Sequence, residues 1–203
     1  MSVALPVSGH HSEHAGNDES KVRLGMLFYV LTDVIFVAFL FASYIWLRAY
    51  NTDNGWLPAH YRMPNSSTTY VLDALVVVSA VCFYIAFRGV RAGNQAALRV
   101  GAVLALVLLV VALVWQIRFM GQQQFAATDG SFASTFIVLS GYHVYHMLIG
   151  LFLGLGLTIR ALRGKYTAEH HLGLVTIGYF WYWMALMPVL FTLIMTVLPP
   201  DKL

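Results

Sequence analysis

Residues 132–159 read FASTFIVLSGYHVYHMLIGLFLGLGLTI and contain no Asp, Glu, Lys or Arg, yet they include two histidines, His143 and His146. A membrane-spanning helix needs about 20 mainly apolar residues, so this stretch is long enough to cross a bilayer. Because His143 and His146 are three residues apart, they share one face of such a helix. The stretch therefore predicts a transmembrane helix that carries two imidazoles inside the membrane.

The composition of the whole chain also indicates an integral membrane protein. Of the 203 residues, 59% are hydrophobic and 10% are charged, whereas a soluble domain carries about 25% charged residues. The one cysteine, Cys82, excludes an internal disulfide and a cysteine-based metal cluster. The net charge of +3 does not indicate a nucleic-acid partner, because basic residues gather in the cytoplasmic loops of membrane proteins.

Five apolar segments predict an all-α bundle of five transmembrane helices, because backbone groups inside hydrocarbon must pair within helices. The predicted helices cover about residues 24–46, 70–87, 100–117, 132–159 and 172–198. Residues 1–20 lack the features of a signal peptide and are polar and small, which predicts a mobile N-terminal tail. The rest of the chain, residues 21–203, forms a single domain.

The basic residues predict the orientation of the bundle. With the N-terminus inside, eight of the twelve Lys and Arg residues lie in cytoplasmic segments and four lie outside. The positive-inside rule therefore predicts a cytoplasmic N-terminus and an external C-terminus.

One carboxyl and the two imidazoles are predicted at the same depth. Asp33 is nine residues from Leu24, hence about 14 Å from the inner face of the membrane. His143 is eleven residues beyond Phe132 on a helix that enters from outside, hence roughly 16 Å deep. A carboxyl inside the membrane needs a partner. We therefore expect a structural polar core in which Asp33 contacts His143 or His146 across two helices, with no catalytic or metal site.

Other residues predict packing and surface contacts. Gly150 and Gly154 have the G-x-x-x-G spacing that lets helices approach closely. Gln116 and Arg118 end the third predicted helix near the outer interface, and both are candidates for contact with lipid or a partner.

The fifth predicted helix holds an aromatic run, GYFWYW, at residues 178–183. The sequence leaves open whether this run faces lipid, a partner or another helix, and Tyr182 and Trp183 are candidate contacts for lipid or a partner. Pro188 is expected to kink the helix and to free a carbonyl. Asp73, near the outer start of the second helix, is expected at the interface.

Three segments together resemble one known family. They are DGSFASTFIVLSGYHVYHMLIG (129–150), LGMLFYVLTDVIFVAFLFASY (24–44) and GYFWYWMALMPVLFTLIMTVL (178–198), and the family is subunit III of the haem-copper oxidases. The five-helix form is similar to the quinol-oxidase and nitric-oxide-reductase-associated branches, in which Asp can replace Glu at the position of Asp33. Tyr182, Ala185 and Pro188 depart from the family, which usually has His, Asp and Trp there.

The resemblance implies a non-catalytic accessory subunit III of a haem-copper terminal oxidase in the aerobic respiratory chain of a bacterial inner membrane. Its partners would be the catalytic subunit I, which holds the haem and copper, and the other oxidase subunits. The chain itself would bind no redox cofactor but would contact phospholipid. The acidic residue at the position of Asp33 is associated in the family with supporting proton uptake and preventing inactivation during turnover. A contribution to proton translocation or oxygen access is also expected.

Three alternatives remain open at the level of sequence. The first is the accessory subunit of a nitric oxide reductase, with the same fold and a different partner. The second is a small ion transporter that uses Asp33 as its ion site. The third is a haem-binding membrane protein that uses His143 or His146 as a ligand.

Overall fold

The computed structural model describes the backbone of residues 10–51, 56–57 and 66–198. It contains five helices: α1 (His10–Tyr50), α2 (Ser66–Arg91), α3 (Gln95–Gly121), α4 (Ser131–Leu162) and α5 (Leu172–Val197). Each helix has a described stretch that is long and apolar enough to cross a membrane. The predicted all-α class with five such helices is therefore confirmed.

The bounds of the helices differ most from the sequence prediction at the N-terminus. Helix α1 begins at His10, so residues 10–20, which were expected to belong to a mobile tail, are helical. Residues 1–9 lie outside the described part of the chain. The other helices begin or end up to five residues away from the predicted bounds, because polar residues such as Ser66, Arg91 and Gln95 continue their end turns.

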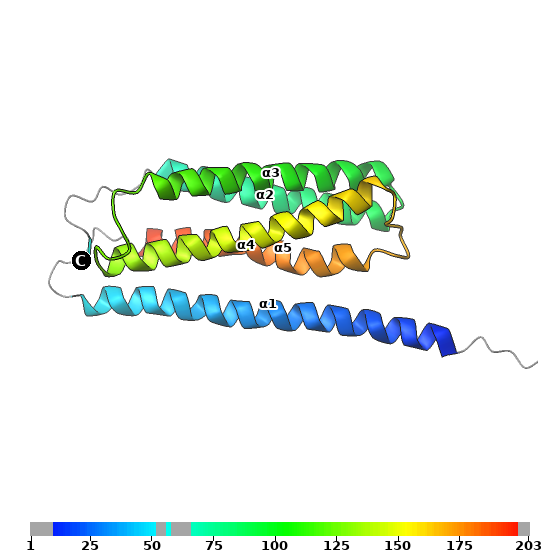
Figure 1. Cartoon of the computed structure of the whole chain (residues 1–203), viewed down its shortest axis with the longest axis horizontal. Coiled ribbons are helices and arrows are strands. Elements are labelled where there is room, and N and C mark those ends of the chain that lie inside the picture. The colour runs from blue at the N-terminus through cyan, green and yellow to red at the C-terminus, as the bar shows by residue number, and fades with distance from the viewer. Residues whose placement is uncertain (1–9, 52–55, 58–65, 199–203) are drawn as a thin grey trace, which may run out of the picture.

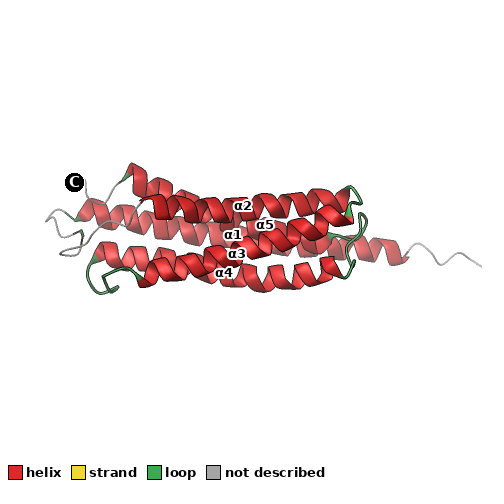
Figure 2. Ribbon diagram, turned by 90° about the horizontal axis from the view of Figure 1, so that it is seen from above, coloured by secondary structure: helices red, strands yellow, loops and turns green. Residues whose placement is uncertain are grey.

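The helices lie side by side along the long axis of the molecule, as Figures 1 and 2 show. Helices α2 and α3 pack most closely together, and α4 and α5 lie between this pair and α1. Within the described residues, α1 packs against α4 and α5 only. Its N-terminal end extends beyond the rest of the bundle (Figure 1).

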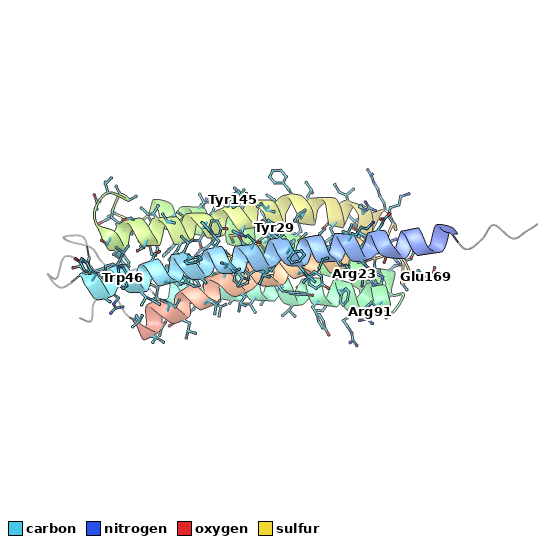
Figure 3. The ribbon with its side chains drawn as sticks, turned by 90° about the horizontal axis from the view of Figure 1, so that it is seen from below. Arg23, Tyr29, Trp46, Arg91, Tyr145 and Glu169 are labelled. Carbon is cyan, nitrogen blue, oxygen red and sulfur yellow. The ribbon has the colours of Figure 1, made fainter. Side chains whose placement is uncertain are left out.

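The surface of the bundle is suited to lipid. Large apolar side chains are exposed on all five helices, with Phe39 66% exposed and Phe152 74% exposed. Helices that are apolar on every side belong in a membrane or in a large core. Arg23, Arg91 and Glu169 lie toward one end of the bundle and Trp46 lies near the other (Figure 3).

A short turn sets the close pairing of α2 and α3. Gly93 adopts a left-handed conformation with φ of 71° after the end of α2, where a residue with a β-carbon would be strained. The Asn94 side chain then accepts a hydrogen bond of 3.0 Å from the Ala97 amide and caps α3. The two helices approach so closely that a β-carbon on Gly101 would lie 2.7 Å from the Ala86 nitrogen.

A polar chain inside the main core ties three helices together. The Trp181 indole on α5 donates to the Ser79 hydroxyl on α2 at 3.2 Å. The Ser79 hydroxyl in turn donates to the Ala105 carbonyl on α3 at 2.8 Å. Trp181 also stacks on Phe83, with 5.1 Å between ring centroids. The indole nitrogen is therefore satisfied inside the bundle, which lets this large ring be buried.

The two glycines expected to pack helices lie at the contacts of α4. A β-carbon on Gly154 would lie 2.7 Å from the Trp181 ring, and one on Gly150 would lie 2.8 Å from the Met184 sulfur. Both glycines are buried. Their lack of side chains therefore lets α4 sit close to α5, at the level where Trp181 enters the core.

Replacing Gly101 tests the close contact of α2 and α3. We expect Gly101→Ala to lower the free energy of unfolding by about 1–3 kcal/mol, because the added methyl meets backbone atoms that cannot move aside. The matched control is Gly156→Ala, since no heavy atom lies within 4 Å of a β-carbon there. This control should be neutral or stabilising by less than about 1 kcal/mol. Unfolding of the purified protein in mixed detergent micelles gives both values, and equal effects would contradict the packing.

Candidate functional site

The Asp33 carboxyl lies inside the bundle and is hydrogen bonded to two other helices. It is 7% exposed. Its Oδ1 accepts a hydrogen bond of 2.5 Å from the Tyr142 hydroxyl. Its Oδ2 accepts one of 2.5 Å from the Trp183 indole and lies 2.9 Å from His146 Nε2. We call these four residues the Asp33 cluster; they join α1 to α4 and α5.

The spacing of residues on α4 explains how the cluster forms. Tyr142 and His146 are four residues apart, so their side chains lie one above the other on the same face. Trp183 reaches the same carboxyl from the aromatic run of α5. The ring of Phe180, one turn away on α5, stacks on the His146 ring, with 5.8 Å between centroids. Two helices thus present complementary donors to one carboxyl.

The hydrogen bonds of His146 define how protons are arranged in the cluster. Its Nδ1 lies 2.8 Å from the Tyr142 carbonyl oxygen, and since a carbonyl only accepts, Nδ1 carries a hydrogen. A single further proton then lies between His146 Nε2 and Asp33 Oδ2. Whether this proton is on the imidazole or on the carboxyl, the pair has no net charge. That neutrality lowers the cost of burying both groups in hydrocarbon.

His143 occupies a different environment from His146. It is 5% exposed, and its ring has a hydrogen-bonding interaction with the backbone of Met184. Pro188 lies four residues after Met184 and has no amide hydrogen, so it frees the Met184 carbonyl. Among the described residues, His143 Nε2 has no hydrogen-bond partner. The histidine that meets Asp33 is therefore His146.

The residues expected to contact lipid or a partner differ in how much of each side chain is exposed. Trp183 is 9% exposed and belongs to the Asp33 cluster, whereas Tyr182 beside it is 38% exposed. Gln116 is buried, and its Oε1 has no partner among the described residues. Arg118 is exposed near the end of α3. Neither Tyr182 nor Gln116 nor Arg118 takes part in the hydrogen bonds of the Asp33 cluster.

Two functional features were not predicted from the sequence. Tyr142 was not singled out, although the four-residue spacing to His146 is a readable signal for a shared face. The burial of Asp73, which is 8% exposed, was also not predicted; its expected position near the membrane interface stays a prediction. Within the described part of the chain, no group of three or more His, Cys, Asp or Glu residues could hold a metal ion.

A cavity of about 510 Å³ opens near the C-terminal end of α4, the start of α5 and the N-terminal part of α1. Arg160, Lys165 and His170 supply basic groups to its lining, and Glu19 supplies one carboxyl. Most of the remaining lining is apolar, with Phe152, Leu153, Leu157, Leu172 and Ile177. The Arg160 guanidinium lies 5.5 Å from the centre of the Tyr166 ring. Burial raises the pKa of the Tyr166 phenol, and Arg160 partly offsets that shift. Because the basic side chains outnumber the single carboxyl and the walls are apolar, the lining fits an anionic amphiphile.

A double-mutant cycle tests whether Asp33 and His146 interact energetically. We expect the effects of Asp33→Ala and His146→Ala on the free energy of unfolding to be non-additive by about 1 kcal/mol. Either change alone leaves the other polar group buried without its hydrogen-bond partner. The control pairs Asp33→Ala with His143→Ala, which should add within about 0.5 kcal/mol. Detergent unfolding of the four proteins in each cycle measures the coupling. Equal coupling to both histidines would contradict the assignment.

Comparison with known proteins places the chain in a family. The family model described as cytochrome c oxidase subunit III matches residues 5–198. The cytochrome c oxidase subunit 3 of Heterololigo bleekeri is 27% identical over 167 residues, which is 80% of this chain and 64% of that protein. The protein of the same name from Loxodonta africana is 26% identical over 180 residues, which is 87% of this chain and 68% of the relative.

The chain thus spans slightly less than two thirds of the length of the Heterololigo bleekeri protein. It spans slightly more than two thirds of the length of the Loxodonta africana protein. The family match includes all four residues of the Asp33 cluster and the whole of all five helices. The chain belongs to the cytochrome c oxidase subunit III family.

Proposed function

We propose that the chain is the non-catalytic accessory subunit of a haem-copper terminal oxidase and lies beside the catalytic subunit in a bacterial inner membrane. The match to the family model over residues 5–198 carries this proposal. The names of the relatives identify them as subunits of cytochrome c oxidase. The haem and copper would be held by the catalytic subunit.

The hydrogen bonding of Asp33 supports a structural role over ion transport. Three side chains on α4 and α5 already surround its carboxyl. An ion that used this carboxyl as a ligand would have to displace those donors, and so would break the polar contact between α1 and the bundle. The cluster is therefore better suited to hold helices together than to release and rebind an ion.

The same cluster supports a secondary role in proton uptake. One proton lies between His146 and Asp33, and Tyr142 and Trp183 both donate to the carboxyl. A hydrogen-bonded pair of this kind holds a proton inside the membrane without net charge. We infer that it supports proton entry into the catalytic subunit by keeping a protonatable group at this depth.

The cavity beside Arg160 supports a role in lipid binding. Its basic side chains suit a phosphate group, and its apolar walls suit an acyl chain. A phospholipid bound there would fill the space between α1, α4 and α5. It would add to the packing that holds α1 in place.

We also propose that the N-terminus faces the cytoplasm and the C-terminus faces outward, as the distribution of basic residues predicts. Alkaline phosphatase fused after Leu203 should be active, because this enzyme folds outside the cytoplasm. Green fluorescent protein fused at the same place should be dark. The reverse pattern would contradict the orientation.

Removing the chain from its host tests the proposed function. We expect the remaining oxidase to begin oxygen consumption normally and then to lose activity progressively during turnover. The wild-type chain should restore sustained activity and should copurify in mild detergent with subunits that carry haem and copper. Oxygen uptake over time, the optical spectrum and mass spectrometry of the complex provide the readouts.

Three outcomes would contradict this proposal, and each identifies an alternative. Copurification with a nitric oxide reductase would indicate that this enzyme, and not an oxidase, is the partner of the chain. Ion flux through the purified chain alone in liposomes would indicate a transporter. A Soret band in the spectrum of the isolated chain would indicate that it binds haem itself.

A further inference from the structure

Four of the five helices enclose a common interior. Helix α3 packs against α2 and α4, and α5 packs against the same two helices, so the four helices form a ring. Within the described residues, α2 does not pack against α4, and α3 does not pack against α5. Side chains that point inward from these helices therefore meet along one axis. The starts of α2 and α4 and the ends of α3 and α5 lie at the same end of the ring (Figure 1).

Three buried polar side chains of the ring carry atoms that lack a partner. Asp73 on α2, Gln116 on α3 and His143 on α4 are 8%, 4% and 5% exposed. Among the described residues, nothing forms a hydrogen bond with Asp73 Oδ1, Gln116 Oε1 or His143 Nε2. Buried polar side-chain atoms in native proteins are mostly hydrogen bonded, either to protein or to ordered water. Three such atoms on three successive helices of one ring therefore indicate a ligand.

The contacts between α3 and α4 place Gln116 level with His143. A β-carbon on Gly150 of α4 would lie 3.2 Å from the Leu109 side chain of α3. The two helices are antiparallel, and seven residues further on α3 and seven residues back on α4 lie Gln116 and His143. Seven residues make about two turns, so both helices present the same faces again. Beyond this level the helices stay in contact, since the ring of Phe119 lies 6.2 Å from that of a phenylalanine of α4.

Helix α2 brings Asp73 close to the same level. The Ser79 hydroxyl of α2 donates to the Ala105 carbonyl of α3. In this antiparallel pair, Asp73 therefore lies beside residue 111 of α3, about 8 Å along the axis from Gln116. Side chains lean toward the N-terminal ends of their helices, so Asp73 and Gln116 lean toward each other. The Thr192 hydroxyl of α5 lies next to the Asp73 carboxyl, so all four helices contribute polar groups.

The unpartnered atoms are hydrogen-bond acceptors. Asp73 Oδ1 and Gln116 Oε1 are oxygen atoms of a carboxyl and of an amide carbonyl. The His143 ring meets the Met184 carbonyl through Nδ1, which therefore carries a hydrogen. In a neutral imidazole, Nε2 then has a free lone pair. Acceptors do not bond to one another, so the ligand has to supply hydrogens.

Water fits this chemistry better than a metal ion. A buried water typically makes about three hydrogen bonds to groups that the protein leaves unsatisfied. A hard cation such as Ca²⁺ takes about six to eight oxygen ligands, which is more than these side chains offer. Within the part of the chain that the structure describes, no cluster of His, Cys, Asp and Glu suits a metal. The adjoining buried residues Ala112 on α3 and Ser140 on α4 are small.

We propose that ordered water occupies the interior of the ring at this level and donates hydrogen bonds to Asp73, Gln116 and His143. We call this place the ring water site. His143 is then the hydrated histidine of α4, whereas His146, one turn away, bonds directly to Asp33. The site brings exchangeable protons within one turn of the Asp33 cluster. The proposal does not rest on the proposed function, because it depends on the packing of this chain alone.

Solid-state nuclear magnetic resonance of the wild-type chain in bilayers tests the ring water site. With ¹⁵N in the histidine rings, magnetisation that starts on water should reach His143 Nε2 at short mixing times. His146 provides the control at nearly the same depth, because both of its ring nitrogens have protein partners. Its ring should receive no such transfer. Equal transfer to both rings, or none to His143, would overturn the proposal.

Replacing Gln116 tests whether the water depends on the polar groups of the ring. Gln116→Leu removes one acceptor, so we expect most of the transfer from water to His143 to be lost. The matched control is Gln95→Leu at the other end of α3, where the Gln95 side chain donates to the Tyr166 carbonyl. This control should leave the transfer to His143 unchanged. Equal loss in the two variants would overturn the proposal.

The wild-type spectra also identify the two rival occupants. A correlation between the side-chain amide hydrogens of Gln116 and His143 Nε2 would show a direct hydrogen bond between them and would overturn the proposal. A shift of the His143 signals on exchange of Na⁺ for K⁺ in the buffer would indicate a bound cation and would also overturn it.

The ring water site and the proposed function fail in different ways. If the chain copurifies with no haem-bearing subunit, the proposed function fails and the water site is unaffected. If no magnetisation from water reaches His143, the water site fails and the proposed function is unaffected.

Discussion

The hydrogen bonds to the Asp33 carboxyl are the constraint on which the arrangement of α1 depends. This helix packs against α4 and α5 only, within the described residues, and little of its apolar length is buried. Apolar contacts give little preference for one rotation of a helix in lipid, because lipid tails are as apolar as the side chains they replace. A carboxyl that reaches Tyr142, His146 and Trp183 allows one rotation and one depth. The shared proton keeps the buried pair neutral, which makes such a contact affordable inside a membrane.

Helix α5 connects this contact to the rest of the bundle. Within one turn, Trp183 donates to Asp33 on α1 and Trp181 donates to Ser79 on α2. The Ser79 hydroxyl in turn donates a hydrogen bond to the Ala105 carbonyl on α3. The aromatic run of α5 therefore faces mainly inward, and its indole nitrogens distribute hydrogen bonds to both sides of the bundle. These hydrogen bonds fix the positions of α1, α2, α3 and α5 relative to one another.

Much of the fold and part of the site followed from the sequence. The apolar segments located all five helices, and counting residues from their ends placed Asp33 and the histidines at one depth. Counting residues could not show which of His143 and His146 contacts Asp33, because residues three apart share a face of the helix. The choice depends on the rotation of α4, which is set by the close contacts of Gly150 with Met184 and of Gly154 with Trp181. Trp183 was expected to contact lipid or a partner. The sequence does not show which group accepts a hydrogen bond from an indole until the position of the neighbouring helix is known.

The central claim is that Asp33 and His146 share a proton in a direct contact between α1 and α4. Solid-state nuclear magnetic resonance of the chain in bilayers, with ¹³C in Asp33 and ¹⁵N in His146, tests it most directly. The account predicts a dipolar coupling between the Asp33 carboxyl carbon and His146 Nε2, together with a protonated Nδ1. A His146 that lacks the Nδ1 hydrogen, or an Asp33 carboxyl without coupling to the imidazole, would contradict it.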